Sequence, residues 1–519
     1  MEIKSETSYT KNIKCSDVYT ESAADYSLPD YLGDVRKILF SEATLRPSGR
    51  FAGGDEVEFS GVVVYNVIYL DSEGNLSSVE FTSDYDYSVK CSGESYKDSV
   101  SDTRVSAFAI RLVGPRKISA RASLVGSVRL SEEEHLSVSG NGFESDSAPE
   151  TSVKTVFVRN SRISSSIERE YAEQVANFEG AIADEVSVVY SFAEVICDSV
   201  SIENEAVLVK GRLRMNALVE NEEQAAFSAE KIVSFEEKVD FEGVNPEMCF
   251  SPKLTVSSLK ANINATEVGC ELVMNGIVEF CVVADCNEQV DLLLDAYLKK
   301  TPTENSYQNF DYLSLISHSS VKGNHNAELD RSSLESDLIR EIVLMTATPK
   351  VERVEYADSV VNIFGEIRYS GIASEMVGDK ISYLSVKFSS PFATNVNIDC
   401  QKCENLQVDA RVVTHSATAS MDAEKIYVGC VLESSVLVCE EKNEKVLSAF
   451  AIKEGEDQDS VNAKITVYYP ADGDTLFSVA KRFRTSVLKV AKDNSISESV
   501  FSSSNPDGKL TGVKKLIIY

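Results

Sequence analysis

The feature that most constrains this chain is a threefold internal repeat. In each copy an alanine is followed 18 residues later by a glycine that starts a strand-like run, and another such run follows 65–68 residues after that glycine. The markers are Ala43, Gly61 and Gly126, then Ala193, Gly211 and Gly276, then Ala347, Gly365 and Glu433, the last standing where a glycine is expected. The copies are offset by 150 and 154 residues, much longer than the ~20–50 residues of a solenoid unit. The spacing therefore predicts three copies of one domain, each long enough for its own core.

The texture inside each copy is that of β-strands. Between residues 118 and 130, apolar and small side chains occupy the even positions, while serines and arginines fill most of the odd positions. Residues 272–280 and 428–438 repeat this alternation, which is typical of strands with one solvated face. We therefore expect a mainly β protein with three antiparallel β-sandwich-like domains. Their predicted bounds are residues 20–138, 154–300 and 335–452.

Three segments between these domains lack the alternation. Two of these segments contain many small and polar residues, and we interpret both as linkers: residues 139–153 and residues 301–334. Residues 334–344 are predicted to form a short helix that leads into the third copy. The acidic segment 454–460 has no apolar anchor and is predicted to be a flexible tether.

Composition excludes several classes of function. The chain has 82 acidic and 51 basic residues, a formal net charge of −31, and such a body repels nucleic acid. Its apolar runs are far shorter than the ~20 residues of a membrane-spanning helix, so no transmembrane segment is predicted. The first residues lack the basic and apolar regions of a signal peptide, which indicates a cytoplasmic protein. Its 11 cysteines are therefore expected to be reduced.

The chain offers little that could carry chemistry. The four histidines, His135, His318, His325 and His415, form no metal-binding motif. Cys400 and Cys403 form a lone C-x-x-C pair without the second ligand pair of a zinc site. We therefore expect a reduced turn pair there, with no metal, no cofactor and no enzymatic activity. A wall hydrolase, which needs two carboxylates facing each other across a cleft, is a further hypothesis, because the sequence singles out no such pair but does not exclude one.

The sequence pattern changes after the acidic segment, from strand-like alternation to one that includes helical spacing. Residues 465–469 form a predicted strand, followed by a turn in which Asp474 or Thr475 can cap a helix. A second short helix follows Thr485-Ser486 and ends near Asn494, and residues 516–519 form a closing strand. This predicts a small βααβ domain over residues 462–519.

That order and those residues resemble a LysM domain. In LysM domains an N-acetylglucosamine polymer lies in a groove between the first turn and the loop that follows the second helix. The resemblance implies a binding groove here, with Phe477 standing where Trp is common. The groove residues carried over to this chain are Gly473, Asp474, Thr475, Leu476, Phe477 and Asn494.

The whole chain is similar to clostridial spore-coat morphogenetic proteins of the SipL type, which carry repeated SPOCS domains before one LysM domain. Leu28-Pro29-Asp30 and the strands at Gly61, Gly211 and Gly365 contribute to this similarity. The resemblance implies a non-enzymatic scaffold in the mother cell, at the forespore surface, whose LysM domain docks on the stage IV sporulation coat ATPase. Residues 461–519 carry a net charge of +4 against −35 for the rest, which favours an acidic protein partner. The alternative is a cell-wall protein that binds peptidoglycan or N-acetylglucosamine.

Overall fold

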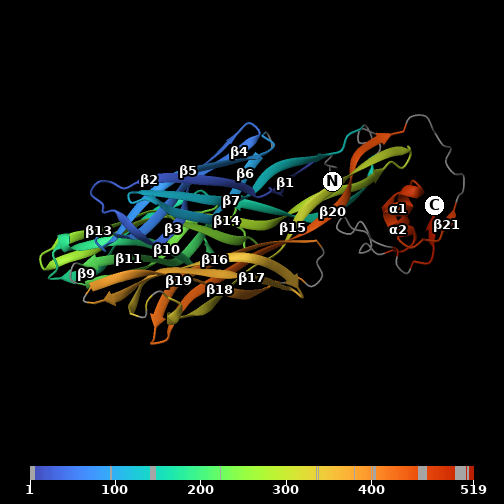
Figure 1. Cartoon of the computed structure of the whole chain (residues 1–519). Coiled ribbons are helices and arrows are strands. Elements are labelled where there is room, and N and C mark those ends of the chain that lie inside the picture. The colour runs from blue at the N-terminus through green and yellow to red at the C-terminus, as the bar shows by residue number, and fades with distance from the viewer. Residues whose placement is uncertain are drawn as a thin grey trace.

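The computed structural model of the chain is an elongated body of long, twisted strands with a small helical module at one end (Figure 1). It describes residues 6–93, 96–140, 148–221, 224–334, 336, 338–378, 380–398, 400, 405–453, 465–496, 510 and 513–519. Most of these residues lie in antiparallel strands, so the prediction of a mainly β protein is confirmed. Among the described residues, no helix has the length and apolar character needed to cross a membrane.

Each repeat contains a three-stranded sheet of the same register. In each sheet the marker alanine pairs with the residue 22 positions later in the chain: Ala43 with Tyr65, Ala193 with Met215, and Ala347 with Tyr369. The first sheet contains β3 (Val35–Gly53), β4 (Glu56–Asp71) and β5 (Leu76–Lys90). The second contains β10 (Val186–Glu203), β11 (Ala206–Asn221) and β12 (Gln224–Asp240), and the third β16 (Ile339–Ala357), β17 (Val360–Val377) and β18 (Lys380–Asn397). The three alanines therefore occupy equivalent sites.

The first marker glycine of each repeat leaves room for an aromatic ring. Gly211 lies opposite Phe235 on β12, and a Cβ atom added to it would lie 2.6 Å from that ring and 2.1 Å from the carbonyl oxygen of Ile196. Gly61 faces Tyr85, and Gly365 faces Phe392, in the same way. Because any side chain would collide with ring and backbone, glycine is required at this position of each repeat.

A second sheet closes each repeat around a long final strand. In the first repeat, β1 (Glu6–Lys14), β2 (Val18–Ser27) and β6 (Tyr96–Gly114) pair with β7 (Lys117–Ser137). In the second, β8 (Glu150–Ile163), β9 (Ile167–Glu179) and β13 (Cys249–Thr266) pair with β14 (Gly269–Tyr297). In the third, β15 (Thr303–Asp330) and β19 (Leu406–Met421) pair with β20 (Lys425–Ile452). A separate apolar cluster joins the two sheets of each repeat.

Several sequence predictions about the third repeat are wrong. Residues 301–334 are no linker, because β15 runs from Thr303 to Asp330 along the whole of β20. The predicted helix at 334–344 is replaced by β16, which begins at Ile339. Glu433, which stands where the repeat spacing places a glycine, lies beside the fully buried Ser434 on β20. Part of the predicted first linker also belongs to a strand, since β8 begins at Glu150.

The three repeats meet around one apolar cluster. Leu39 and Phe40, Val189 and Tyr190, and Val343 and Leu344 lie at the repeat offsets of 150 and 154 residues, and all are buried together. A β-bulge lies at each of these positions. The extra residue at such a bulge shifts the pairing, and here two successive side chains are both buried. The repeats therefore share a common core with approximate threefold symmetry.

At the other end, three two-stranded ribbons form what we call the stalk. It consists of residues 6–14 with 129–137, 150–163 with 283–297, and 303–315 with 439–452. Its interior is apolar and contains Tyr9, Val290 and Phe310, with the rings of Tyr9 and Phe310 4.9 Å apart. The stalk extends toward the helical module (Figure 1).

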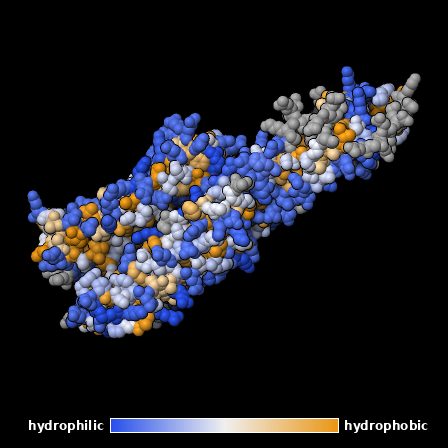
Figure 2. All heavy atoms as spheres, turned by 90° about the horizontal axis from the view of Figure 1, so that it is seen from above, coloured by the Kyte–Doolittle hydropathy of each residue, from blue (hydrophilic) through white to orange (hydrophobic). Residues whose placement is uncertain are grey.

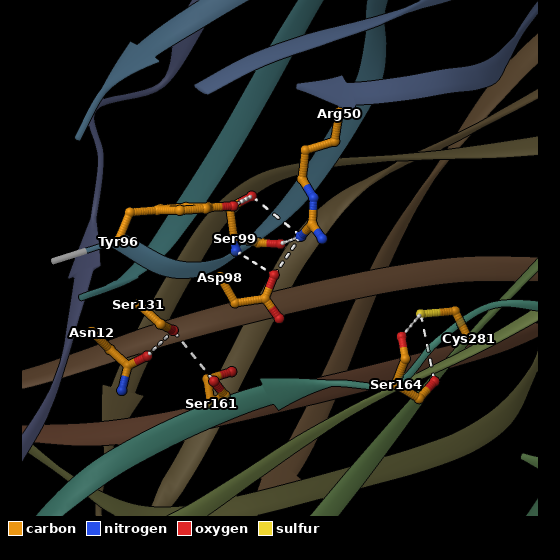
Figure 3. Close-up of polar contacts among 9 residues, drawn as sticks. All are labelled: Asn12, Arg50, Tyr96, Asp98, Ser99, Ser131, Ser161, Ser164 and Cys281. Atoms are coloured by element: carbon orange, nitrogen blue, oxygen red, sulfur yellow. Dashed lines mark hydrogen bonds and ion pairs between the residues drawn. The ribbon is translucent and has the colours of Figure 1, made fainter. Parts of the chain in front are cut away.

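A polar layer lies where the stalk joins the body. The Arg159 guanidinium donates to Asp285 Oδ1 at 2.6 and 2.9 Å, and both side chains are only 3% exposed. Nearby, Ser131 of the first repeat donates to Asn12 at 2.8 Å and contacts the Ser161 carbonyl oxygen of the second repeat (Figure 3). Hydrogen bonds therefore link different repeats across this junction.

The C-terminal module contains β21 (Thr466–Tyr468), α1 (Leu476–Arg482), α2 (Val487–Asp493) and β22 (Leu516–Ile518). The two strands pair antiparallel, Val467 opposite Ile517. Its interior holds Leu476, Val479, Ala480, Val490 and Leu516, together with Tyr297 from the stalk. The predicted tether at 454–460 lies outside the described residues.

Candidate functional site: the C-terminal module and its seat

The turn before α1 is fixed by a carboxylate. Asp474 Oδ2 accepts hydrogen bonds from the Tyr468 hydroxyl at 2.7 Å and from the Ala471 backbone N–H at 2.8 Å. These bonds lower the pKa of Asp474, with the Tyr468 hydroxyl as the largest cause. Gly473 has a φ of +94°, a left-handed conformation that favours glycine. Asp474 and Gly473 therefore shape the turn.

Thr475 and Leu476 anchor the first helix. The Thr475 hydroxyl accepts from the Ser478 N–H at 3.0 Å, and the Ser478 hydroxyl accepts from the Thr475 N–H at 3.0 Å. This reciprocal pair is a capping box, which satisfies two otherwise unpaired N–H groups. Leu476 is only 1% exposed and packs inside the module.

Asn494 connects the second helix to the closing strand. Its amide donates to the carbonyl oxygens of Val490 at 2.9 Å and Ile517 at 2.8 Å, and its Oδ1 accepts from the Ile517 N–H at 2.6 Å. With these bonds, the amide side chain is committed to holding α2 against β22. Of the six predicted groove residues, four therefore have internal roles: Asp474, Thr475, Leu476 and Asn494.

Phe477 lies on the side of the module that faces the stalk. Its ring packs edge-to-face on Tyr297 of β14, with centroids 5.3 Å apart. Tyr297 is 2% exposed, and its hydroxyl donates to the Thr485 carbonyl oxygen at 2.6 Å. The structure thus brings Phe477 together with a stalk residue that the sequence did not single out.

An ion pair completes the contact between the module and the stalk. We call this whole contact the seat, and it consists of Asp295, Tyr297, Phe477, Lys481 and Thr485. Lys481 Nζ lies 2.6 and 2.7 Å from the two carboxylate oxygens of Asp295. Asn305 and Tyr307 of β15 also donate to Asp295 Oδ1, at 2.6 and 3.0 Å. Since the module residues of the seat lie nearly 190 residues from Asp295 in the chain, no local pattern could have predicted the seat. The opposite charges of module and body were the one available signal.

The opposite side of the module is more open. Val467 of β21 and its flanking residues Ile465 and Tyr469 alternate along the chain and are 50%, 58% and 70% exposed. Lys514 and Lys515 just before β22 are exposed as well. The body seen from above is mostly hydrophilic with separate apolar patches (Figure 2), so that view offers no single continuous apolar face.

Outside the module, the sequence analysis singled out a cysteine pair and four histidines. Cys400 is disulfide-bonded, so the expectation of a reduced thiol there was wrong; Cys403 lies outside the described residues. His415 Nε2 lies 3.4 Å from Glu433 Oε2. Within the described ranges, no group of three or more His, Cys, Asp or Glu residues could hold a metal ion. Nine other cysteines in those ranges are free.

Comparison with known proteins returned no match to any family model, curated protein or solved structure.

Proposed function

We propose that this protein is a non-enzymatic scaffold of spore coat assembly, acting in the mother cell at the forespore surface. Its C-terminal module, a LysM domain in this proposal, docks on the stage IV sporulation coat ATPase. The three preceding repeats are the SPOCS-like part of the scaffold, and their long strands provide faces and edges for other coat proteins.

The observation that carries this proposal is the placement of the module. A basic module of net charge +4 stands at the end of a stalk on a body of net charge −35. Opposite charge steers association with an acidic partner. The exposed residues of β21 and the lysines before β22 supply apolar and basic contacts for that partner.

Removal of the module tests the proposal. We expect a chain ending at Lys453 to lose forespore localisation and binding to the ATPase, while its thermal unfolding still reports a folded body. A full-length variant with Lys514 and Lys515 changed to Gln should associate more slowly and with weaker salt dependence. Normal localisation of the truncated chain would contradict the proposal.

A glycan-binding wall protein is the alternative, and the resemblance to LysM domains is what favours it. Binding of chitin oligosaccharides by the full chain, measured beside the ATPase, separates the two functions. Tight oligosaccharide binding with no ATPase binding would replace the proposed function by this one.

A further inference from the structure

Tyr297 of the stalk covers Phe477, a predicted groove side chain that packs at the edge of the module's apolar interior. Asp474, Thr475, Leu476 and Asn494 hold the module together, and Gly473 carries no side chain. Phe477 is the remaining member, and Tyr297 packs against its ring. A partner that uses Phe477 therefore competes with the stalk for the same surface.

The stalk also shows what chemistry fits this surface. Asp295 and Tyr297 lie two residues apart near the end of β14, and residues so spaced on a strand point to the same side. Asp295 supplies a carboxylate to Lys481, and Tyr297 supplies a ring to Phe477 and a hydroxyl donor to the Thr485 carbonyl oxygen. These contacts define a site for an extended segment with an acidic residue two positions before an aromatic one.

We infer that the end of β14 is an exchangeable occupant of this site: a partner segment with the sequence acidic–any–aromatic displaces Asp295 and Tyr297 from the module. This inference rests on the proposed function for the identity of the partner, the ATPase. Opening the seat and binding the partner are thermodynamically linked, so weakening the stalk contact strengthens partner binding by the same factor.

Asp295→Asn is the decisive variant. The amide keeps an oxygen that can accept from Asn305 and Tyr307, so the stalk bonds survive while the ion pair to Lys481 is lost. Lys481→Gln breaks the same ion pair by changing the module instead of the stalk. It therefore also opens the seat, but it removes the cation that the partner's carboxylate needs. Asp291→Asn is the matched control, because Asp291 lies on the same ribbon and pairs with Thr155.

A fluorescent reporter measures opening without any partner. The chain contains no Trp, so Phe477→Trp places a single tryptophan in the seat. We expect blue-shifted emission in the otherwise unchanged chain and in the Asp291→Asn control, and red-shifted emission with Asp295→Asn or Lys481→Gln. Red-shifted emission from the chain that carries Phe477→Trp alone would overturn the inference, because it would mean that the seat is already open.

Two binding arms complete the test. The first probe is a synthetic peptide of residues 291–300, and the second is the ATPase; a peptide with alanine at both key positions is the control. We expect both probes to bind the Asp295→Asn chain roughly 5- to 150-fold more tightly than the unchanged chain, and the Lys481→Gln chain no more tightly. Equal peptide binding by the unchanged and Asp295→Asn chains would overturn the inference. Tighter peptide binding with no ATPase binding would uphold the exchangeable site and reject the proposed partner.

Discussion

At the scale of single residues, Gly61, Gly211 and Gly365, the first marker glycine of each repeat, explain why the repeat is visible in the sequence. Each lies where a ring from the next strand and a carbonyl oxygen from the preceding strand approach the backbone. The collision distances for an added Cβ are shortest at Gly211 and Gly365, 2.1 Å to the carbonyl oxygens of Ile196 and Lys350. Such a close approach tolerates no side chain, so these positions keep glycine for a steric reason.

We predict that Gly211→Ala destabilises the protein by about 1–3 kcal/mol, because the methyl group must displace backbone or the Phe235 ring. Urea unfolding followed by circular dichroism measures the change. Gly323→Ala is the control, since no described atom lies within 4 Å of the Cβ that it adds to β15. Equal urea midpoints for the two variants would show that the Phe235 ring packed over Gly211 does not constrain this site.

Glu42 carries a second residue-scale prediction. Burial raises the pKa of this carboxyl, Glu194 raises it further, and the Tyr190 hydroxyl opposes the shift by donating to Glu42 Oε2 at 2.6 Å. The folded state therefore holds the proton more tightly than the unfolded state, whose glutamate pKa is about 4.3. The stabilising effect of protonation is complete below that pKa and is lost as pH rises through the raised folded pKa.

We therefore expect Glu42→Gln to raise the melting temperature at pH 7.5 relative to the unchanged chain, with a smaller difference at pH 4. Differential scanning calorimetry of both proteins at the two pH values measures this. A difference that does not change with pH would mean that ionisation of Glu42 is not involved.

At the scale of elements, the two short helices of the module are capped differently. The Thr475 capping box gives α1 reciprocal side-chain bonds at its first turn. Ser486 precedes α2 without a side-chain capping bond among the described residues. Helices of seven residues are marginal alone, so caps and packing decide whether they form.

We predict that Thr475→Ala destabilises the module by about 1 kcal/mol, while Ser486→Ala has a much smaller effect. Hydrogen exchange of the α1 amides should accelerate in the first variant only. Equal acceleration of exchange in both variants would show that the capping box does not hold the helix.

At the scale of the whole molecule, the three repeats are packed together rather than structurally independent. Equivalent residues of all three are buried in one cluster around Phe40, Tyr190 and Leu344. Arg159 and Asp285 then form a buried ion pair at the base of the stalk. Burial has the largest single effect on the pKa of Arg159 and lowers it. The Asp285 carboxylate and the other nearby acidic groups raise that pKa, and the net result is a raised pKa.

Breaking that pair should cost far more than breaking a surface pair. We expect Asp285→Asn to destabilise the protein by about 3–5 kcal/mol, because it leaves a buried guanidinium unpaired. Asp198→Asn, which breaks the Arg212 pair of 46% and 42% exposed side chains, should cost less than about 1 kcal/mol. Thermal unfolding at low and high salt compares them, and similar losses in the two variants would contradict the assigned role of Asp285.

Local patterns in the sequence determined the β-strand character of the repeats and their equivalent positions. The alternation at 118–130 reflects the two-residue period of a strand, and the 18-residue step from Ala43 to Gly61 placed equivalent positions correctly. The helices of the module followed from helical spacing and from a cap at Asp474 or Thr475, of which the structure shows Thr475 to be the one used. Such features depend on neighbours in the chain, which is why they could be inferred from sequence alone.

Only the tertiary structure decided which strands and faces meet. The segment 303–330 looked like a linker because it is polar, yet pairing with β20 satisfies its backbone groups and makes it a strand. The seat likewise joins Asp295, Tyr297 and Lys481 across nearly 190 residues, as the Lys481–Asp295 separation of 186 shows. Contacts of this kind depend on complementary surfaces brought together by the whole fold, and no periodicity along the chain encodes them.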